Sequence, residues 1–153
     1  MGSFAGPAVV LRPASPSDID ALYRWRMDPD TRAASLSTSA IPFEAHRAWL
    51  LDLLADSTRR LFVAECDGIP VGTIRADLRD EISELSWTVA PEHRGRGIGT
   101  QMVVLMAASI SGPIEAVVKA GNPASVRIAE AAGMRLRSNS DGLLRFFRGP
   151  IGG

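Results

Sequence analysis

Three glycines at alternating positions carry the clearest chemical signal in this chain. They lie within residues 94–100 (sequence RGRGIGT), between two apolar segments. We expect a strand over residues 83–89, a turn, and a helix over residues 97–110. The first N–H groups of a helix have no partner within it, and the helix dipole adds positive potential at that end. The turn therefore predicts a site for a phosphate or pyrophosphate, to which Arg94 and Arg96 add formal charge.

Two familiar phosphate motifs do not fit this turn. A P-loop needs a Lys followed by Ser or Thr after its last glycine, whereas Gly99 is followed by Thr100-Gln101. The dinucleotide fingerprint is G-x-G-x-x-G near the start of a βαβ unit, whereas this chain has G-x-G-x-G after residue 90. Two other interpretations stay open, namely a glycine-rich turn with no ligand and a module for a nucleotide such as ATP.

The turn resembles the acetyl-CoA-binding motif of the GNAT superfamily of N-acetyltransferases, Arg/Gln-x-x-Gly-x-Gly/Ala, which Arg94, Gly97 and Gly99 match. Residues 122–134 resemble the second half-motif of the family, because they begin Asn-Pro-Ala-Ser-Val-Arg and end Gly-Met. The resemblance implies acetyl-CoA as co-substrate and no metal. The residues then expected to bind the coenzyme are Trp87, Thr88, Val89, Arg94, Gly95, Arg96, Gly97, Ile98, Gly99, Thr100, Asn122 and Ser125.

The pattern of apolar segments predicts the order β-α-α-β-β-β-α-β-α-β-β, with residues 31–42 as a loop between the first two helices. This order is similar to the GNAT fold, an α/β (α+β) fold whose mixed, twisted sheet of six or seven strands has helices on both faces. We expect one such domain over residues 7–148, with loose tails at 1–6 and 149–153. The resemblance implies that strands 83–89 and 114–118 splay apart and admit the pantetheine arm of the coenzyme.

Composition excludes several classes of protein. The chain has 153 residues, 46% of them hydrophobic, and a formal net charge of +0, so no basic field attracts nucleic acid. The single cysteine, Cys66, allows no intrachain disulfide and suits a cytoplasmic location. No apolar run approaches the ~18 residues of a membrane span, and no signal peptide pattern opens the chain. The GNAT resemblance implies a small-molecule amine as partner.

The GNAT resemblance implies direct attack of the acceptor amine on the thioester within a ternary complex. Glu84 is the candidate base, acting directly or through water, with a solvated carboxylate as the alternative. His46 is a weaker candidate, since its helical position also suits a buried structural residue. Many family members have a Tyr seven positions after the Asn of the second half-motif, but here that position is Ala129. This absence keeps open a non-catalytic acyl-CoA-binding regulatory module.

Residues 24–32, with Glu44, His46 and Trp49 and the segments 61–65 and 72–75, resemble the GNAT subgroup that acetylates nucleotide-linked 4-amino sugars. Arginines suit a diphosphate, and an aromatic ring stacks on a base or sugar. In the other interpretation, Trp25 and Trp49 belong to the core, and the arginines pair with surface carboxylates. Peptide N-termini, small amines and antibiotics also stay open as acceptors. The residues expected to bind the acceptor are Arg24, Trp25, Arg26, Arg32 and Arg75.

The last expected strand has two adjacent aromatic residues, Phe146 and Phe147. Neighbouring side chains on a strand point to opposite faces, so one of the two rings is expected at the surface. Proteins of the GNAT fold often pair through their sheet or C-terminal hairpin. A homodimer is therefore a further expectation from the resemblance.

Overall fold

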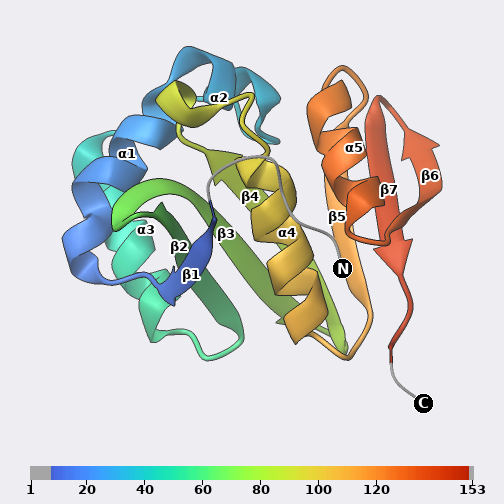
Figure 1. Cartoon of the computed structure of the whole chain (residues 1–153). Helices are drawn as coiled ribbons and strands as arrows, with labels where there is room; N and C mark the ends of the chain where they lie inside the picture. The colour runs from blue at the N-terminus through green and yellow to red at the C-terminus, as the bar shows by residue number, and fades with distance from the viewer. Residues whose placement is uncertain (1–7, 152–153) are drawn as a thin grey trace.

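The computed structural model describes residues 8–151, so the expected tail at 1–6 lies outside the described residues. A seven-stranded sheet of order β1-β2-β3-β4-β5-β7-β6 has helices on both faces (Figure 1). This arrangement confirms the predicted fold class. The elements are β1 (Val10–Pro13), α1 (Ile19–Met27), α2 (Pro29–Ala34), α3 (Phe43–Ala55), β2 (Arg59–Cys66), β3 (Ile69–Arg79), β4 (Ile82–Val89), α4 (Ile98–Ser109), β5 (Ile114–Lys119), α5 (Pro123–Ala131), β6 (Arg135–Ser140) and β7 (Leu143–Arg148).

Two apolar clusters hold the helices against the sheet. On one face, Met102 and Met106 of α4 are at most 1% exposed and pack with Ile74 and Leu85 of the sheet. On the other face, residues of α1 and α3 pack against β2. Helix α3 buries Leu50 and Leu53 there, at the helical spacing that the sequence predicts. Burial of apolar side chains on both faces fixes β3 and β4 in the middle of the molecule.

Helix α2 was not predicted, because residues 31–42 were expected to form a loop. The Asp28-Pro29 pair ends α1 and also starts α2. The Asp28 carboxylate accepts a hydrogen bond of 3.0 Å from the Thr31 N–H, as an N-cap does, and Pro29 takes the first helical position. The irregular segment that remains is shorter and covers residues 35–42.

Strands β4 and β5 splay apart as predicted. They run parallel, and their register contains only the pairs Ser83↔Ile114 and Glu84↔Glu115 at one end. Beyond Glu84, the two strands diverge toward the end of the molecule where α2 and the N-terminus of α5 lie (Figure 1). The edge of β4 over residues 86–89 is therefore not paired with β5.

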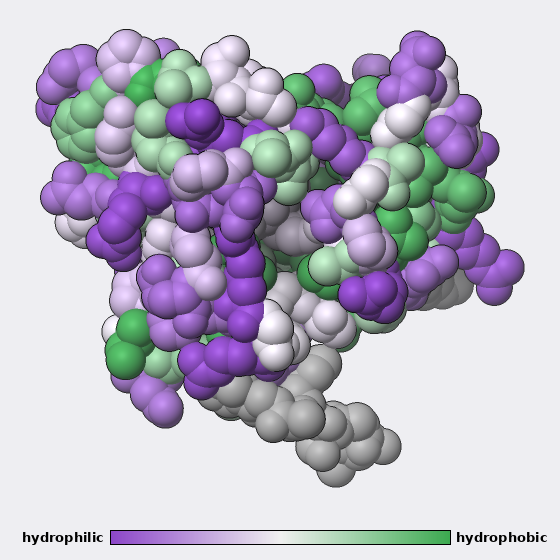
Figure 2. Space-filling view, turned by 90° about the horizontal axis from the view of Figure 1, so that it is seen from above, coloured by the Kyte–Doolittle hydropathy of each residue, from purple (hydrophilic) through white to green (hydrophobic). Residues whose placement is uncertain are grey.

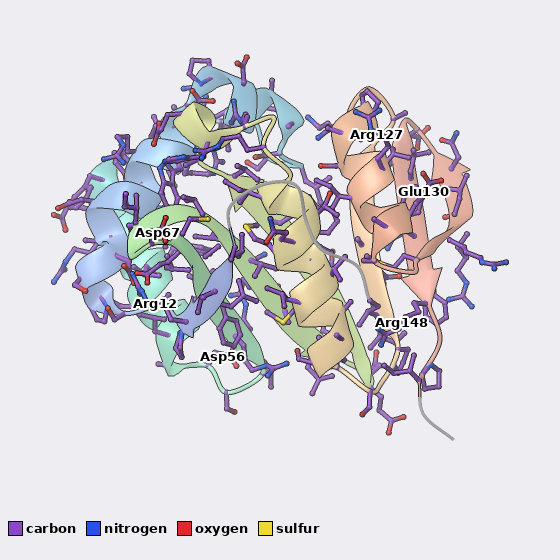
Figure 3. The ribbon with its side chains drawn as sticks, viewed as in Figure 1. Arg12, Asp56, Asp67, Arg127, Glu130 and Arg148 are labelled. Atoms are coloured by element: carbon purple, nitrogen blue, oxygen red, sulfur yellow. The ribbon has the colours of Figure 1, made fainter. Side chains whose placement is uncertain are left out.

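The C-terminal segment forms a hydrogen bond with the loop that follows α4. The Ile151 N–H donates to the Ser111 carbonyl at 2.8 Å. One residue before that segment, Arg148 lies where β7 reaches the C-terminal end of α4 (Figure 3). Its guanidinium donates to three carbonyl groups there, those of Ala107 (2.8 Å), Ile110 (2.7 Å) and Gly112 (2.8 Å). These bonds join the end of β7 and residue 151 to the C-terminal end of α4 and the loop after it.

The two aromatic residues of β7 have different surroundings. Phe146 is 1% exposed in the core, whereas Phe147 is half-buried beneath the Arg137 guanidinium, 4.0 Å from the ring centroid. The ring expected at the surface is thus covered in part by an arginine of β6. Within residues 8–151, no helix has the length and apolar content needed to cross a membrane.

Candidate active site

The glycine turn leads into α4 with an open surface above it. Gly95 and Gly97 both have a φ of +77°, the left-handed region that favours glycine. A Cβ atom built at either position meets nothing within 4 Å. Helix α4 begins at Ile98, so the N–H groups of its first turn face this open space without helical partners. The backbone geometry is that of an anion site.

The third glycine has a packing role. A Cβ atom at Gly99 would lie 2.8 Å from Ile128 Cδ1 and 3.3 Å from Val89 Cγ2. Gly99 therefore lets α4 approach α5 and β4 closely. Ile98 is 1% exposed and belongs to the core. At these two positions, only the backbone N–H groups remain for a ligand.

The two arginines of the turn already have partners. Arg94 donates from Nη2 to Asp28 Oδ2 at 3.2 Å and to the Thr31 hydroxyl, which ties the turn to the α1–α2 corner. The Thr31 N–H and the Arg94 guanidinium hold the pKa of Asp28 below its usual value. Arg96 donates to His93 Nδ1 at 3.0 Å. The Arg94 side chain thus fixes the position of the turn, and Asp28 offsets its charge.

Ser125 and Asn122 line the other side of the gap between β4 and β5. Asn122 caps α5, since its Oδ1 accepts from the Ser125 N–H at 3.2 Å. The Ser125 hydroxyl accepts from Trp87 Nε1 at 3.3 Å, across the gap. Nearby, Lys119 Nζ donates to the Ala33 carbonyl at 2.8 Å and joins the end of β5 to the end of α2. Seen from above, a hollow separates the α5–β6–β7 part from the rest of the molecule (Figure 2).

A row of polar side chains lies on the sheet face opposite α4. The antiparallel register pairs Asp77 with Glu84, Arg75 with Ser86, and Thr73 with Thr88. Residues paired in this way point to the same face, and Leu85, between Glu84 and Ser86, is buried on the α4 side. Polar residues at alternate positions of β4 are the sequence signal for this row, of which the sequence interpretation named Glu84, Thr88 and Arg75 but did not place them on one face.

Glu84 stands where the two strands part. It is the last residue of β4 in register with β5, opposite Glu115. Its carboxylate lies 3.6 Å from Arg79 Nη2, and its side chain is 24% exposed. Glu115 has the same side-chain exposure and lies 3.6 Å from Arg145. Two half-buried carboxylates therefore flank the point at which the gap opens.

Arg75 joins this row to helix α3. Its Nε donates to Asp77 Oδ2 at 3.1 Å, and its guanidinium carbon lies 5.7 Å from the centroid of the Trp49 ring. Asp77 is 3% exposed and also accepts from Arg59. Among residues 8–151, the two terminal nitrogens of Arg75 have no hydrogen-bond partner. They are available to a ligand on this face.

Comparison with known proteins identifies the family. The family model described as "Acetyltransferase (GNAT) domain" matches residues 8–135. The chain belongs to the GNAT acetyltransferase family. Over 124 residues it is 30% identical to the L-2,4-diaminobutyric acid acetyltransferase of Nocardia farcinica, an alignment that covers 76% of this chain and 60% of that protein. The chain thus matches less than two thirds of that relative's length.

Solved structures share this GNAT fold over nearly their whole length. The spermidine N-acetyltransferase of Vibrio cholerae, solved with CoA and spermine, superposes with a TM-score of 0.84 at 17% identity, covering 93% of this chain and 95% of that one. An acetyltransferase from Thermus thermophilus gives a TM-score of 0.78 at 28% identity, covering 94% and 97%. The first likeness supports the fold alone, because its identity is low.

The GNAT domain does not gather all the residues expected to bind the acceptor. Arg75 lies in the row of polar side chains on the sheet face opposite α4, which is the open face of β3 and β4. Arg24 is exposed and lines a shallow depression of about 500 Å³ with Pro91 and Glu92. Trp25 is 2% exposed and packs with core leucines, so its ring offers no free face for stacking. Arg26 of α1 and Arg32 of α2 each have a buried side-chain nitrogen with no hydrogen-bond partner among residues 8–151.

His46 lies away from the point where the strands part. It is 3% exposed on α3, with its ring centroid 5.3 Å from that of Tyr23 and 5.2 Å from that of Trp49. Burial, and then the nearby charge of Arg26, lower the pKa of His46 below its usual value. Its neighbours are thus aromatic rings and an arginine. No group of three metal-ligating side chains occurs in the part of the chain that the structure describes.

Proposed function

We propose that this GNAT domain transfers an acetyl group from acetyl-CoA to a primary amine by direct attack in a ternary complex. The observation that carries the proposal is the gap between β4 and β5, which opens after Glu84 and has the glycine turn at its far end. The N–H groups of the turn suit the pyrophosphate of the coenzyme. The unpaired edge of β4 suits the amides of the pantetheine arm, since backbone polar groups need partners.

The thioester then lies at the narrow end of the gap, where β4 and β5 begin to diverge, beside Glu84. An ammonium has no lone pair, so the acceptor must lose a proton before it attacks. Glu84 is the proposed base, acting directly or through one water molecule. Position 129 of α5 is a fully buried alanine. The single tyrosine of the sequence, Tyr23, lies on α1 and donates its hydroxyl proton to the Ile41 carbonyl. In this mechanism the thiolate leaves without a tyrosine acid, and positioning supplies most of the catalysis.

The acceptor that fits best is an amine that also carries an anionic group. Arg75 has free terminal nitrogens on the open face, and Arg26 has no carboxylate partner within residues 8–151. A polyamine would meet these positive charges unfavourably. The resemblance of residues 24–49 to a nucleotide-linked amino sugar subgroup supports a sugar nucleotide as acceptor. The diaminobutyrate substrate named for the Nocardia relative supports a small amino acid as the second candidate.

Release of CoA thiol from acetyl-CoA, measured with a panel of amines, tests the proposal. The panel contains a nucleotide-linked 4-amino sugar, L-2,4-diaminobutyrate, spermidine, an aminoglycoside and a peptide with a free N-terminus. We expect turnover that is highest with the anionic amines. Calorimetry with CoA and with ATP accompanies the assay, and we expect binding of CoA only. Tight CoA binding without turnover of any amine would favour a non-catalytic acyl-CoA-binding module, for which Ala129 is the specific observation.

A further inference from the structure

Four buried side-chain nitrogens have no hydrogen-bond partner in the described part of the chain, and all belong to α1, α2 or α3. They are Trp25 Nε1, Arg26 Nη1, Arg32 Nε and His46 Nε2. Buried polar atoms nearly always have partners, because an unpaired one loses its hydrogen bonds to water without replacement. Such atoms indicate a ligand or water that completes the site. Two of the four, on Arg26 and His46, belong to one neighbourhood: the His46 ring lies 5.3 Å from the Tyr23 ring, and Arg26 follows Tyr23 by one turn of α1.

The irregular segment over residues 36–42 is hydrogen-bonded to α1 next to Arg26 and His46. Arg26 donates from its other terminal nitrogen, Nη2, to the carbonyl groups of Ser37 (3.1 Å) and Ser39 (3.2 Å). Tyr23 donates to the Ile41 carbonyl at 2.8 Å. Residues 36–40 of the segment are exposed to solvent. Arg26 therefore holds the segment with one nitrogen and keeps the other, Nη1, unpartnered below it.

The imidazole of His46 contacts two aromatic rings. The centroids of the Tyr23 and Trp49 rings lie 5.3 Å and 5.2 Å from its own. Trp49 in turn lies 5.7 Å from the Arg75 guanidinium on the open sheet face. The pair is thus one aromatic side chain away from the face where the acceptor is proposed to bind. A ligand that reaches both places would be larger than a simple amine.

An oxyanion satisfies both unpartnered groups at once. It accepts from Arg26 Nη1 and from His46 Nε2–H, and it offsets a guanidinium that has no ion pair with a carboxylate among residues 8–151. We propose that Arg26 and His46 together bind an oxyanion of the acceptor, a phosphate or a carboxylate, beneath residues 36–42. This inference rests on the proposed transfer to an anionic amine. It makes His46 a residue that positions the acceptor and not the base.

The imidazole resonances of the two histidines, His46 and His93, provide a test that needs no turnover. The variant His93→Gln identifies the His46 signal. The full chain is titrated with pH in pyrophosphate, in acetate and in sodium chloride, at equal ionic strength. We expect pyrophosphate to raise the pKa of His46 by about one unit relative to chloride, because a bound anion favours the charged imidazole. A shift of that size in acetate alone would assign a carboxylate as the ligand.

Two variants test whether the anion-induced rise in the pKa of His46 depends on Arg26. Arg26→Gln should abolish the anion-induced shift, whereas Arg47→Gln, an exposed arginine next to His46 on α3, should retain it. The wild-type titration decides the matter even if Arg26→Gln does not fold. The same His46 titration curve in pyrophosphate, acetate and chloride would overturn the inference and leave buried water as the partner of these groups. That result leaves acetyl transfer untouched, because CoA binding and thiol release are measured separately.

Discussion

The indole Nε1 of Trp87 donates a hydrogen bond of 3.3 Å to the Ser125 hydroxyl and thereby joins β4 to α5 across the gap between the splayed strands. Asn122 Nδ2 donates to the same oxygen at 3.2 Å. A serine hydroxyl accepts at its lone pairs and donates its single proton. With two donors on its oxygen, Ser125 keeps its proton for a third group. A carbonyl of the pantetheine arm in the gap is the natural acceptor.

Replacement of Ser125 by alanine tests this arrangement. Ser125→Ala removes the donor and leaves two side-chain N–H groups without their acceptor. We expect the Kd for CoA to rise about five- to twentyfold, which corresponds to about 1–2 kcal/mol. Isothermal titration calorimetry measures it. Ser109→Ala is the control, because that hydroxyl donates to Met106 at the far end of α4. An unchanged Kd in the folded Ser125→Ala variant would contradict a contact with the coenzyme.

Gly97 and Gly142 form a matched pair for the pyrophosphate site. Their φ angles are +77° and +76°, and within residues 8–151 a Cβ built at either position meets no atom within 4 Å beyond its chain neighbours. Glutamate at either position therefore meets the same backbone strain, of roughly 1–2 kcal/mol. Only Gly97→Glu adds a carboxylate at the N-terminus of α4. We expect it to abolish CoA binding, and Gly142→Glu, in the turn between β6 and β7, to leave the Kd unchanged. Equal CoA affinity in both folded variants would refute the pyrophosphate assignment.

Glu84 and Glu115 are a second matched pair, for the catalytic base. Both side chains are 24% exposed, both lie 3.6 Å from an arginine, and they are in register on adjacent strands. We expect Glu84→Gln to lower kcat about 100-fold, in the range that general base catalysis supplies, with an unchanged Kd for CoA. Glu115→Gln should retain most of the activity. Steady-state kinetics with the best amine of the panel measures both, and a larger loss in Glu115→Gln would move the base to β5.

Local sequence signals were enough to predict the elements around the proposed coenzyme site. Asn122 and Pro123 start α5, and Gly133, with a φ of +90°, follows its end. The glycine turn before α4 has its own signal in the spacing of Gly95 and Gly97. Each of these features depends on residues within a few positions of one another. The resemblance to the GNAT motifs then supplied the splay between β4 and β5.

The roles that could not be predicted depend on contacts between distant parts of the chain. Arg94 was expected to bind phosphate with its side chain, but its guanidinium reaches Asp28, 66 positions earlier. Trp25 was expected on a ligand, but its place beside Leu22 on the buried face of α1 makes it core. The α2 helix was missed because Asp28-Pro29 is equally good as a stop and as a start signal. Composition and spacing do not decide such cases.

Arg148 is expected to be a large single contributor to stability. It donates to the carbonyl groups of Ala107, Ile110 and Gly112, at the C-terminal end of α4, where a cation also complements the helix dipole. Arg148→Met removes the charge and leaves these carbonyls without this donor. We expect the free energy of unfolding to fall by about 2–4 kcal/mol, measured by urea titration. Arg148→Lys should recover only part of it, since one ammonium does not reproduce the planar fork of a guanidinium.

Arg137 provides the control for this measurement. It lies on the same hairpin and contacts the Phe147 ring, but it is exposed. Arg137→Met should cost about 1 kcal/mol or less. Because Arg148 lies at the opposite end of α4 from the glycine turn, the Kd for CoA should stay within about twofold in either variant where the protein is folded, since distant sites act independently. Equal losses of stability in Arg148→Met and Arg137→Met would show that the three carbonyl bonds contribute nothing beyond an ordinary surface arginine.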